Sequence, residues 1–244
     1  MSDERTSETD DLARDHRRLQ SHYAEIASLA GGLAHEIRNP LSTIGLNLEL
    51  LTEDLSEGDS PRDRRILQKL TVVQQQCQHL DRILNDFLQF ARVGSLELHR
   101  ADLNSTVHEF IEFFSPQAAE RGIDISPHLA ANLPPVQLDV QLWQQVLMNL
   151  SRNALQAMPN GGVLELQTYG RDNEVMLDII DNGLGMNAET QARMFDTFFS
   201  TKSDGSGLGL PTVRKIVEAH SGTISCESEV GRGTRFSIAL PAAL

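Results

Sequence analysis

The 244-residue sequence has little cysteine, no excess of positive charge and no long hydrophobic run. Its two cysteines, Cys77 and Cys226, lie far apart at apolar positions of periodic segments, which favours buried, reduced thiols over a disulfide or a metal site. The net charge of -13 excludes a nucleic acid or an anionic membrane as a partner held by bulk electrostatics, because either would need a basic surface. Ligands that bind at local sites remain compatible with this charge.

The longest apolar runs fall well short of the ~20 residues that span a bilayer. The first 20 residues are polar and charged, and they lack the hydrophobic region of a signal peptide. We therefore expect a protein with no direct membrane span, located in the cytoplasm. A composition of 40% hydrophobic and 23% charged residues is ordinary for a folded globular protein.

Apolar residues with heptad spacing predict two long helices in the first 92 residues. The first series is Ile26, Ala30, Leu33, Ile37, Ile44, Leu48, Leu51 and Leu55, and the second is Leu67, Leu70, Val73, Cys77, Leu80, Leu84, Phe87 and Ala91. Residues 52–60 form the expected turn, and Pro61 suits the first position of the second helix. Because one antiparallel hairpin buries only part of each stripe, the pattern predicts a homodimer that forms a four-helix bundle.

His35 points away from the first heptad seam, since it lies two positions from both Leu33 and Ile37. Glu36 places a carboxylate beside this imidazole. Pro40 removes a backbone hydrogen bond within the same helix, so a bend is expected just after His35. From this pattern alone, His35 is either an incidental surface residue or a nucleophile.

The pattern changes after a short link at residues 93–95 to alternating strands and helices. Helices are expected over 102–114, 142–158, 188–195 and 210–219, and strands over 123–126, 136–138, 162–169, 175–180, 223–228 and 234–240. The strands 162–169 and 175–180 are close enough to form a hairpin. This order predicts a two-layer α/β sandwich.

Two motifs in this second region indicate a ligand that carries phosphate and an amine. Asn149 and Asn153 are four apart and share one helix face, where their amide oxygens suit Mg²⁺. The run from Asp181 through Gly183 to Gly185 follows an apolar strand. Its carboxylate can accept a hydrogen bond from an exocyclic amine, and its glycines let the backbone approach a ligand. Each motif alone also fits an ordinary helix face or turn.

A third motif is rich in glycine and leads into a predicted helix at Leu210. It comprises Gly205, Ser206, Gly207, Leu208 and Gly209. Free amides at a helix N-terminus attract phosphate. The spacing matches neither the Rossmann fingerprint nor a Walker A loop. The preceding segment 194–202 carries Phe198 and Lys202 and is typical of a lid over phosphates.

In this order the motifs resemble the N, G1, F and G2 boxes of the Bergerat-type ATP-binding domain. The segment around His35 likewise resembles the H box of two-component sensor histidine kinases, and the whole is similar to a soluble, nitrogen-regulation-like kinase core. The resemblance covers residues 28–240 and includes the closing strands around 222–224 and 231–236. Thr197 stands where a proline is frequent, and Ser151 where a larger apolar residue is frequent.

The resemblance implies three parts of the chain. Residues 1–24 form a polar N-terminal segment, in which the spacing of Leu12, Leu19 and Tyr23 permits a coiled-coil input arm. Residues 25–94 form the dimerisation and phosphotransfer hairpin, and residues 95–244 the catalytic ATP-binding domain. The expected cofactors are ATP and Mg²⁺. The expected partners are a second copy of the chain, a response regulator receiver domain and an upstream sensory protein.

The resemblance also implies roles for single residues. His35 is the phosphoacceptor and Glu36 its general base. Asn153 is the Mg²⁺ ligand through the ATP phosphates, Asn149 supports it, and Asp181 recognises adenine. The remaining nucleotide-binding residues are Gly183, Gly185, Phe198, Lys202, Gly205, Ser206, Gly207, Leu208 and Gly209.

Asn39 follows His35 by one helical turn, and relatives use a polar amide three positions after the acid to orient a water that dephosphorylates the regulator. The alternative is a polar spacer before Pro40. For the whole chain, the alternatives are a non-catalytic dimeric scaffold and another Bergerat ATPase, such as a chaperone or topoisomerase relative. The latter lack a hairpin that carries His35 and Glu36. His220, at the end of a predicted helix, suits the C-terminal carbonyls as a cationic or donor side chain.

Overall fold

The computed structural model of the chain divides into two units, residues 1–94 and 95–244. It describes residues 37–53, 55, 61–93, 96–202 and 205–243. In this described part no helix is long and apolar enough to cross a membrane. Cys77 and Cys226 are free, as expected, but both are half-buried, so the expected burial of the two thiols is wrong.

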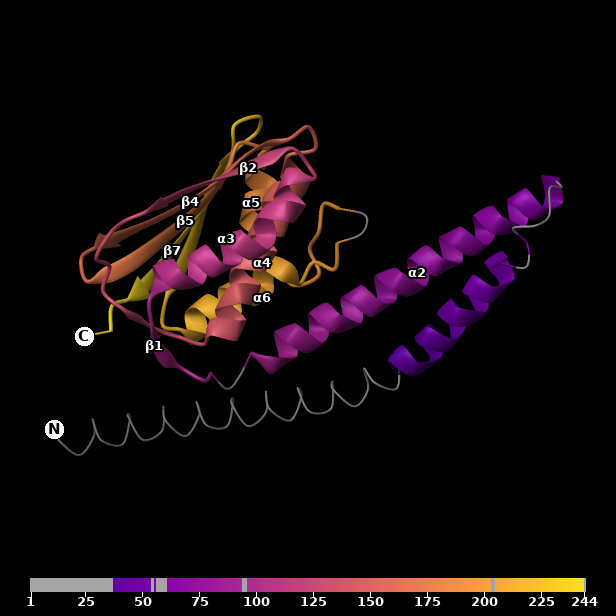
Figure 1. Ribbon diagram of the computed structural model, residues 1–244, viewed down its shortest axis with the longest axis horizontal. Coiled ribbons are helices and arrows are strands. Elements are labelled where there is room, and N and C mark those ends of the chain that lie inside the picture. Colours follow the sequence, from indigo (N-terminus) through magenta and orange to yellow (C-terminus); the bar gives the residue numbers. More distant parts are fainter. Residues whose placement is uncertain (1–36, 54, 56–60, 94–95, 203–204, 244) are drawn as a thin grey trace. The chain divides into compact units, whose positions relative to one another are not determined.

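The first unit contains a helical segment over residues 37–53 and the helix α2 (Pro61–Arg92) (Figure 1). Pro61 begins α2 at the one helical position where its missing N–H costs nothing. Asp63 lies in the first turn, where a carboxylate favours the positive end of the helix dipole. Both heptad series therefore form helices where the structure describes them.

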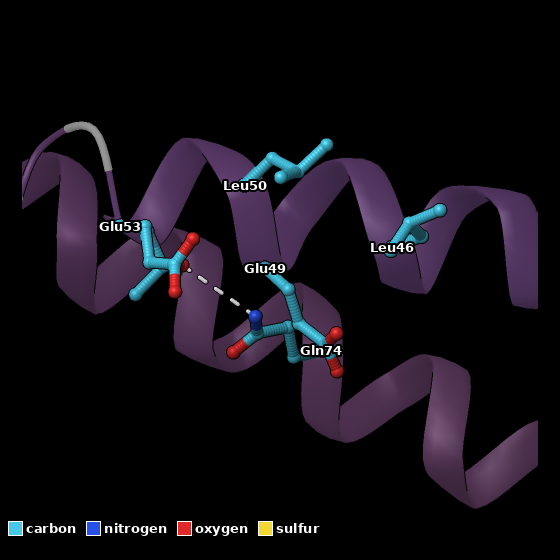
Figure 2. A pocket seen from close by; sticks show the side chains of 6 residues that line it. Leu46, Glu49, Leu50, Glu53 and Gln74 are labelled. Carbon is cyan, nitrogen blue, oxygen red and sulfur yellow. Dashed lines mark hydrogen bonds between the residues drawn. The ribbon is translucent and has the colours of Figure 1, made fainter.

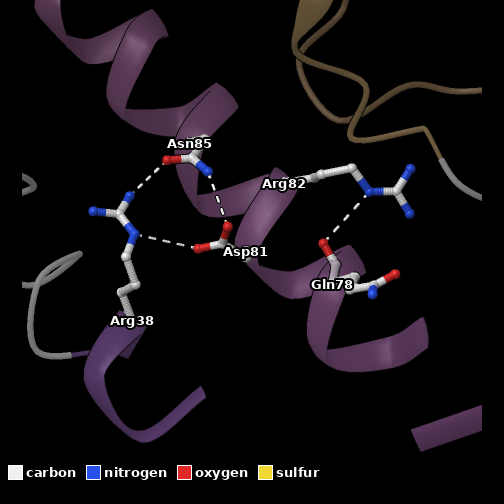
Figure 3. Close-up of polar contacts among 5 residues, drawn as sticks. All are labelled: Arg38, Gln78, Asp81, Arg82 and Asn85. Carbon is white, nitrogen blue, oxygen red and sulfur yellow. Dashed lines mark hydrogen bonds and ion pairs between the residues drawn. The ribbon is translucent and has the colours of Figure 1, made fainter. Parts of the chain in front are cut away.

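Polar side chains join the two helices of this hairpin. The Nη2 of Arg38 donates to Asn85 Oδ1 at 2.6 Å, and its Nε donates to Asp81 Oδ1 at 3.3 Å (Figure 3). Asn85 Nδ2 in turn donates to Asp81 Oδ2 at 3.2 Å, which closes a three-residue network. Further along, Gln74 Nε2 donates to Thr52 Oγ1 at 3.5 Å beside a groove lined by Leu46, Glu49, Leu50 and Glu53 (Figure 2).

The apolar seam of the hairpin is only partly covered within one chain. Leu48, Leu88 and Ala91 are buried, whereas Val73 and Leu80 remain 44% and 51% exposed. Further large apolar side chains are exposed on both helices: Ile37, Ile44, Leu46, Leu50, Leu51 and Val72. A second surface must cover this stripe if the helices are to gain its full hydrophobic stabilisation.

The second unit is built on a five-stranded sheet in the order β2-β4-β5-β7-β6. The strands are β2 (Ile123–Leu129), β4 (Gly162–Arg171), β5 (Glu174–Asp181), β7 (Gly233–Pro241) and β6 (Thr223–Glu229). Only β2 and β4 pair in parallel. A separate two-stranded sheet pairs β1 (His99–Ala101) with β3 (Val136–Leu138).

Three helices cover one face of the five-stranded sheet, which confirms the two-layer sandwich (Figure 1). They are α3 (Leu103–Ala119), α4 (Val140–Ala157) and α6 (Gly209–Ala219), and the short α5 (Ala188–Arg193) follows β5. Alternate strand residues such as Leu164, Leu166, Leu177, Ile179 and Ile238 are buried under them. The core therefore lies between this face and the apolar stripes of the helices.

Two predicted boundaries are wrong for related reasons. The helix expected to end at Phe114 continues through Pro116, because Phe114 and Ala118 on its core face are fully buried and tertiary packing outweighs the lost hydrogen bond. The strand expected to end at Ser126 continues through Pro127. Since β2 is an edge strand of its sheet, a residue without an N–H is tolerated there.

Candidate functional site

The candidate site lies where α4, the end of β5 and the start of α6 meet. Asn149 Nδ2 on α4 donates to Gly209 O at the start of α6, at 3.5 Å. The N–H of Leu184, in the loop after β5, donates to Ala157 O at the end of α4, at 2.9 Å. The structure thus brings together three of the sequence motifs, although they are separated by up to 60 residues in the chain.

Asp181 closes β5 with a buried carboxyl group that is 7% exposed. Its Oδ1 accepts a hydrogen bond from the N–H of Gly183 at 2.9 Å. Burial raises the pKa of Asp181, while the N–H groups of Gly183 and Thr234 favour the charged form and oppose that rise. A carboxyl group anchored in this way can present its other oxygen as a hydrogen-bond acceptor to a ligand amine.

The charge of Asp181 affects the pKa of the nearby Cys226. Burial, Asp181 and Glu227 raise the pKa of this thiol to about 12. The thiol is therefore protonated at neutral pH and a poor nucleophile. Its role is in packing, next to the acidic end of the site.

The loop after β5 is held by backbone contacts that require glycine. Gly185 has a φ of +66°, and a Cβ at this position would run into Glu229 O. The N–H of Gly231, in the turn between β6 and β7, donates to Leu184 O at 2.8 Å. Gly183 likewise lies against Ala157 O. These contacts fix the path of the loop, so its glycines are needed for close packing as well as for any approach of a ligand.

A backbone contact joins Phe198, within the predicted lid segment 194–202, to Gly207 of the glycine-rich motif. The N–H of Phe198 donates to Gly207 O at 3.0 Å, and a Cβ at Gly207 would strike the backbone of Phe198. Phe198 has a φ of +64°, unfavourable for a bulky residue, and its side chain is 66% exposed. The base of this segment is therefore fixed by the backbone and not by burial of Phe198.

Lys202 reaches back from this segment to α4. Its Nζ donates to Asn153 Oδ1 at 3.1 Å and also to Gln156 Oε1. Burial lowers the pKa of Lys202. Sequence reasoning missed Gln156, although it lies three residues after Asn153 and seven after Asn149, on the same helix face. The amide oxygens on this face are thus placed to receive a cation.

The donor set fits Mg²⁺ bound together with a phosphate ligand. Amide oxygens are hard donors, which Mg²⁺ accepts alongside water and phosphate oxygens. Across residues 37–53, 61–93, 96–202 and 205–243, no group of three or more His, Cys, Asp or Glu side chains is arranged to hold a metal ion by itself. Any Mg²⁺ here would be held by amide oxygens together with water or ligand oxygens.

The start of α6 offers a surface on which a phosphate could bind. Its N-cap residue, Leu208, makes no side-chain cap hydrogen bond, and amides at a helix N-terminus attract phosphate. Ser206 Oγ accepts from the N–H of Leu208 at 3.3 Å and stiffens the approach to the helix. Gly205, Gly207 and Gly209 keep this approach free of side chains.

Three of the remaining predicted residues, His35, Glu36 and Asn39, belong to the other unit. His35 and Glu36 lie outside the described residues. Asn39 is exposed on the helical segment 37–53, and its carbonyl accepts from Thr43 Oγ1 at 3.1 Å. Ser151, which departs from the pattern that the motif resembles, is fully buried, and its hydroxyl has no hydrogen-bond partner.

Comparison with known families gives two matches along the chain. Residues 25–96 match the His Kinase A (phospho-acceptor) domain, and residues 138–244 match the histidine kinase-, DNA gyrase B- and HSP90-like ATPase family. The two segments together include the hairpin and every motif of the candidate site.

Curated relatives match over both segments. The sensor histidine kinase ZraS of Klebsiella oxytoca is 36% identical over 217 residues, which cover 88% of this chain and 46% of the relative. The histidine-protein kinase AtoS of Escherichia coli K12 is 32% identical over 219 residues, covering 89% and 35%. The chain spans less than half the length of these relatives.

Solved structures share the architecture. Full-length ShkA in complex with AMPPNP has a TM-score of 0.68 and 29% identity, covering 88% of this chain and 46% of that one. ThkA in complex with the response regulator protein TrrA has a TM-score of 0.67 over 94% of this chain and 66% of that one. Its identity of 23% supports a shared fold only.

Substituting Gly233 should test the backbone packing at Asp181. Gly233 has a φ of +103°, and a Cβ there would strike Asp181 O and lie 2.8 Å from Asn182 Cα. We expect Gly233→Ala to lower the free energy of unfolding by more than about 2 kcal/mol. The measurement is urea unfolding followed by the fluorescence of Trp143, the single tryptophan, which is fully buried in this unit.

Gly231→Ala is the matched control, because Gly231 has a φ of +80° and a Cβ added there would meet nothing within 4 Å. It should cost only the strain of a left-handed alanine, about 1 kcal/mol. Equal losses for the two variants would contradict the proposed constraint.

Proposed function

Because the chain belongs to the sensor histidine kinases of two-component systems, we propose that it uses ATP to phosphorylate itself on His35. It then passes the phosphoryl group to an aspartate of a response regulator receiver domain. The observation that carries this proposal is the convergence of Asn153, Asp181 and the glycine-rich approach to α6 on one site. The activity of the whole protein is a proposal, since the relatives are about twice as long or more.

The nucleotide is bound by groups that the fold already holds in place. Asp181 accepts a hydrogen bond from the exocyclic amine of adenine, and its anchoring to Gly183 sets the direction of the carboxyl group. The N-terminus of α6 faces the phosphates. Asn153, supported by Asn149, holds Mg²⁺, which when bound neutralises phosphate charge.

Lys202 exchanges partners when the nucleotide binds. Its ammonium group donates to Asn153 Oδ1 at 3.1 Å. A phosphate oxygen is a stronger partner for an ammonium group than an amide oxygen. Lys202 therefore moves from Asn153 to the phosphates and leaves the amide oxygen to the metal.

Transfer begins with neutral His35, whose unperturbed pKa of ~6.5 leaves a free lone pair at neutral pH. A ring nitrogen attacks the γ-phosphorus, the bond to the β–γ bridging oxygen breaks, and ADP leaves. Glu36 takes the proton from the other ring nitrogen. The phosphoryl group then passes to a receiver aspartate, which regenerates His35. The signal reaches this core through the N-terminal segment or an upstream sensory protein.

Asn39 supports a second activity, removal of the phosphoryl group from the regulator. Its side chain is on the exposed face of the helix, four residues after His35. An amide there can orient a water for attack on a phosphoaspartate. In the alternative interpretation, Asn39 is a polar spacer before Pro40.

The exposed seam of the hairpin supports a homodimer. Val73 and Leu80 belong to one heptad series and are both exposed in the single chain. A second copy presents the same seam, so a two-fold four-helix bundle buries both. The family match for this segment is also to a domain that carries the phosphoacceptor.

The first test of the proposed kinase compares wild type with His35→Gln after incubation with ATP labelled on its γ-phosphate. We expect acid-labile, base-stable label on the wild-type chain and none above background on the variant. His22→Gln, which alters a histidine ahead of the motif, is the control and should label normally. Equal labelling of His35→Gln would exclude His35 as the phosphoacceptor.

For the proposed phosphatase, Asn39→Ala should slow dephosphorylation of a phosphorylated receiver domain about tenfold or more, because the water is no longer oriented. Autophosphorylation should persist. Asn47→Ala, two turns further along the same helix and also exposed, should leave both rates unchanged. Full phosphatase activity in Asn39→Ala would favour the spacer interpretation.

Sedimentation equilibrium should give about twice the chain mass of 27.0 kDa at micromolar concentration. Leu80→Glu places a charge in the seam and should shift the chain to monomer. Gln75→Glu is the matched control, since Gln75 is exposed on the same helix and lies outside the heptad series. A wild-type monomer would count against the four-helix bundle.

A further inference from the structure

His220 joins the two helices of the candidate site at their far ends. It follows α6 and is only 5% exposed. Its Nδ1 lies 2.8 Å from Ile216 O, and its Nε2 lies 2.9 Å from the N–H of Asp139, which precedes α4. An N–H can only donate, so Nε2 is the acceptor and Nδ1 carries the proton. Of the two roles expected from the sequence, the structure supports a neutral donor and not a cation.

Asp139 organises the beginning of α4 around this imidazole. It is the N-cap residue, and its Oδ1 accepts from the N–H of Leu142 at 3.2 Å. Its Oδ2 accepts from the N–H of Glu97 at 3.1 Å. Trp143, in the first turn and fully buried, meets the imidazole edge to face with ring centroids 5.6 Å apart. The helix start, the imidazole and the segment at Glu97 therefore form one connected network.

The same two helices also meet at the ligand end. There Asn149 Nδ2 on α4 donates to Gly209 O at the start of α6. Because a helix of 18 residues and one of 11 residues behave as stiff rods, two attachments fix their relative position better than one. The attachment at Asn149 is long, at 3.5 Å, whereas both bonds of His220 are short.

We propose that His220 is a positioning residue for nucleotide binding. It holds together the end of α6 and the start of α4, and it thereby sets the distance of Asn149 and Asn153 from the glycine-rich start of α6. The inference rests on the proposed function and deepens it. His220 does not touch the nucleotide, and it acts through the helices that do.

The network holds only while the imidazole is neutral. Burial lowers the pKa of His220. The hydrogen bond to the Ile216 carbonyl and the charge of the Asp139 carboxylate both act to raise this pKa, but burial has the larger effect. If Nε2 were protonated, its N–H would face the backbone N–H of Asp139, and the hydrogen bond between them would be lost. Since the unfolded chain takes up this proton near its ordinary pKa of ~6.5 and the folded chain resists it, stability is full above that pH and falls as the pH drops below it.

The test is the affinity for AMPPNP with Mg²⁺, measured by titration calorimetry on the full chain at pH 7.5. We expect His220→Ala to weaken binding about tenfold, because the N–H of Asp139 loses its buried acceptor. His220→Gln should bind within about threefold of wild type, since its Oε1 can accept the same hydrogen bond. His108→Gln, at an exposed position on α3, is the control and should bind like wild type.

Lowering the pH from 7.5 to 5.5 separates positioning from a general structural role. Wild-type affinity should fall at least about threefold more than that of His220→Gln, which has no imidazole to protonate. The emission of Trp143 and the far-UV circular dichroism report whether each variant is folded. If His220→Ala does not fold, the pH profile of His220→Gln decides the question.

Unchanged affinity in folded His220→Ala, or identical pH profiles of wild type and His220→Gln, would overturn this inference alone. A wild-type chain that binds no nucleotide at either pH would overturn the proposed function, and this inference with it.

Discussion

Close packing of backbone against backbone at the end of β5 is the constraint on which the second unit depends. Gly233 on β7 lies against Asp181, and Gly185 lies against Glu229 at the end of β6. These contacts leave no room for a Cβ, so the chain must pass through a narrow set of conformations there. One side of the site is therefore rigid. It consists of the buried carboxyl group, the loop that follows it and the end of α4. Binding residues on rigid elements keep their geometry without a ligand to hold them.

Much of this arrangement could be predicted from the sequence, because it follows from periodicity and glycine spacing. Heptad spacing predicted both helices of the hairpin, and the resemblance to the Bergerat-type domain implied that the motifs form one site. The predicted ends of α3 and β2 were wrong because each was placed before a proline. The cost of a proline within a helix or strand depends on burial and on edge position, and the local sequence pattern shows neither. Gln156 and the acceptor role of His220 were missed for a similar reason, since each depends on a partner more than 40 residues away.

The two units differ in how far they bury their apolar side chains within one chain. The second unit encloses its apolar residues within one chain, with Trp143, Leu164 and Ile238 fully buried. The first leaves a stripe open and joins its helices through the Arg38, Asp81 and Asn85 network, whose Arg38 and Asp81 side chains are 33% and 42% exposed. Partly exposed ion pairs contribute little stability, so the hairpin is the more adaptable unit. Adaptability suits a segment that, under the proposed function, meets more than one partner surface in turn.

The place of β7 in the sheet has a consequence for how the chain folds. This strand, Gly233–Pro241, lies between β5 and β6 and supplies hydrogen bonds to both, although it comes after both in the sequence. On the ribosome, β5 would therefore wait with one edge unpaired until residue 241 has emerged, while the local hairpin of the first unit has no such delay. The hairpin can form once residue 92 has emerged, and the sheet only after residue 241 has emerged. The order of synthesis thus separates the assembly of the acceptor helices from that of the unit that would act on them.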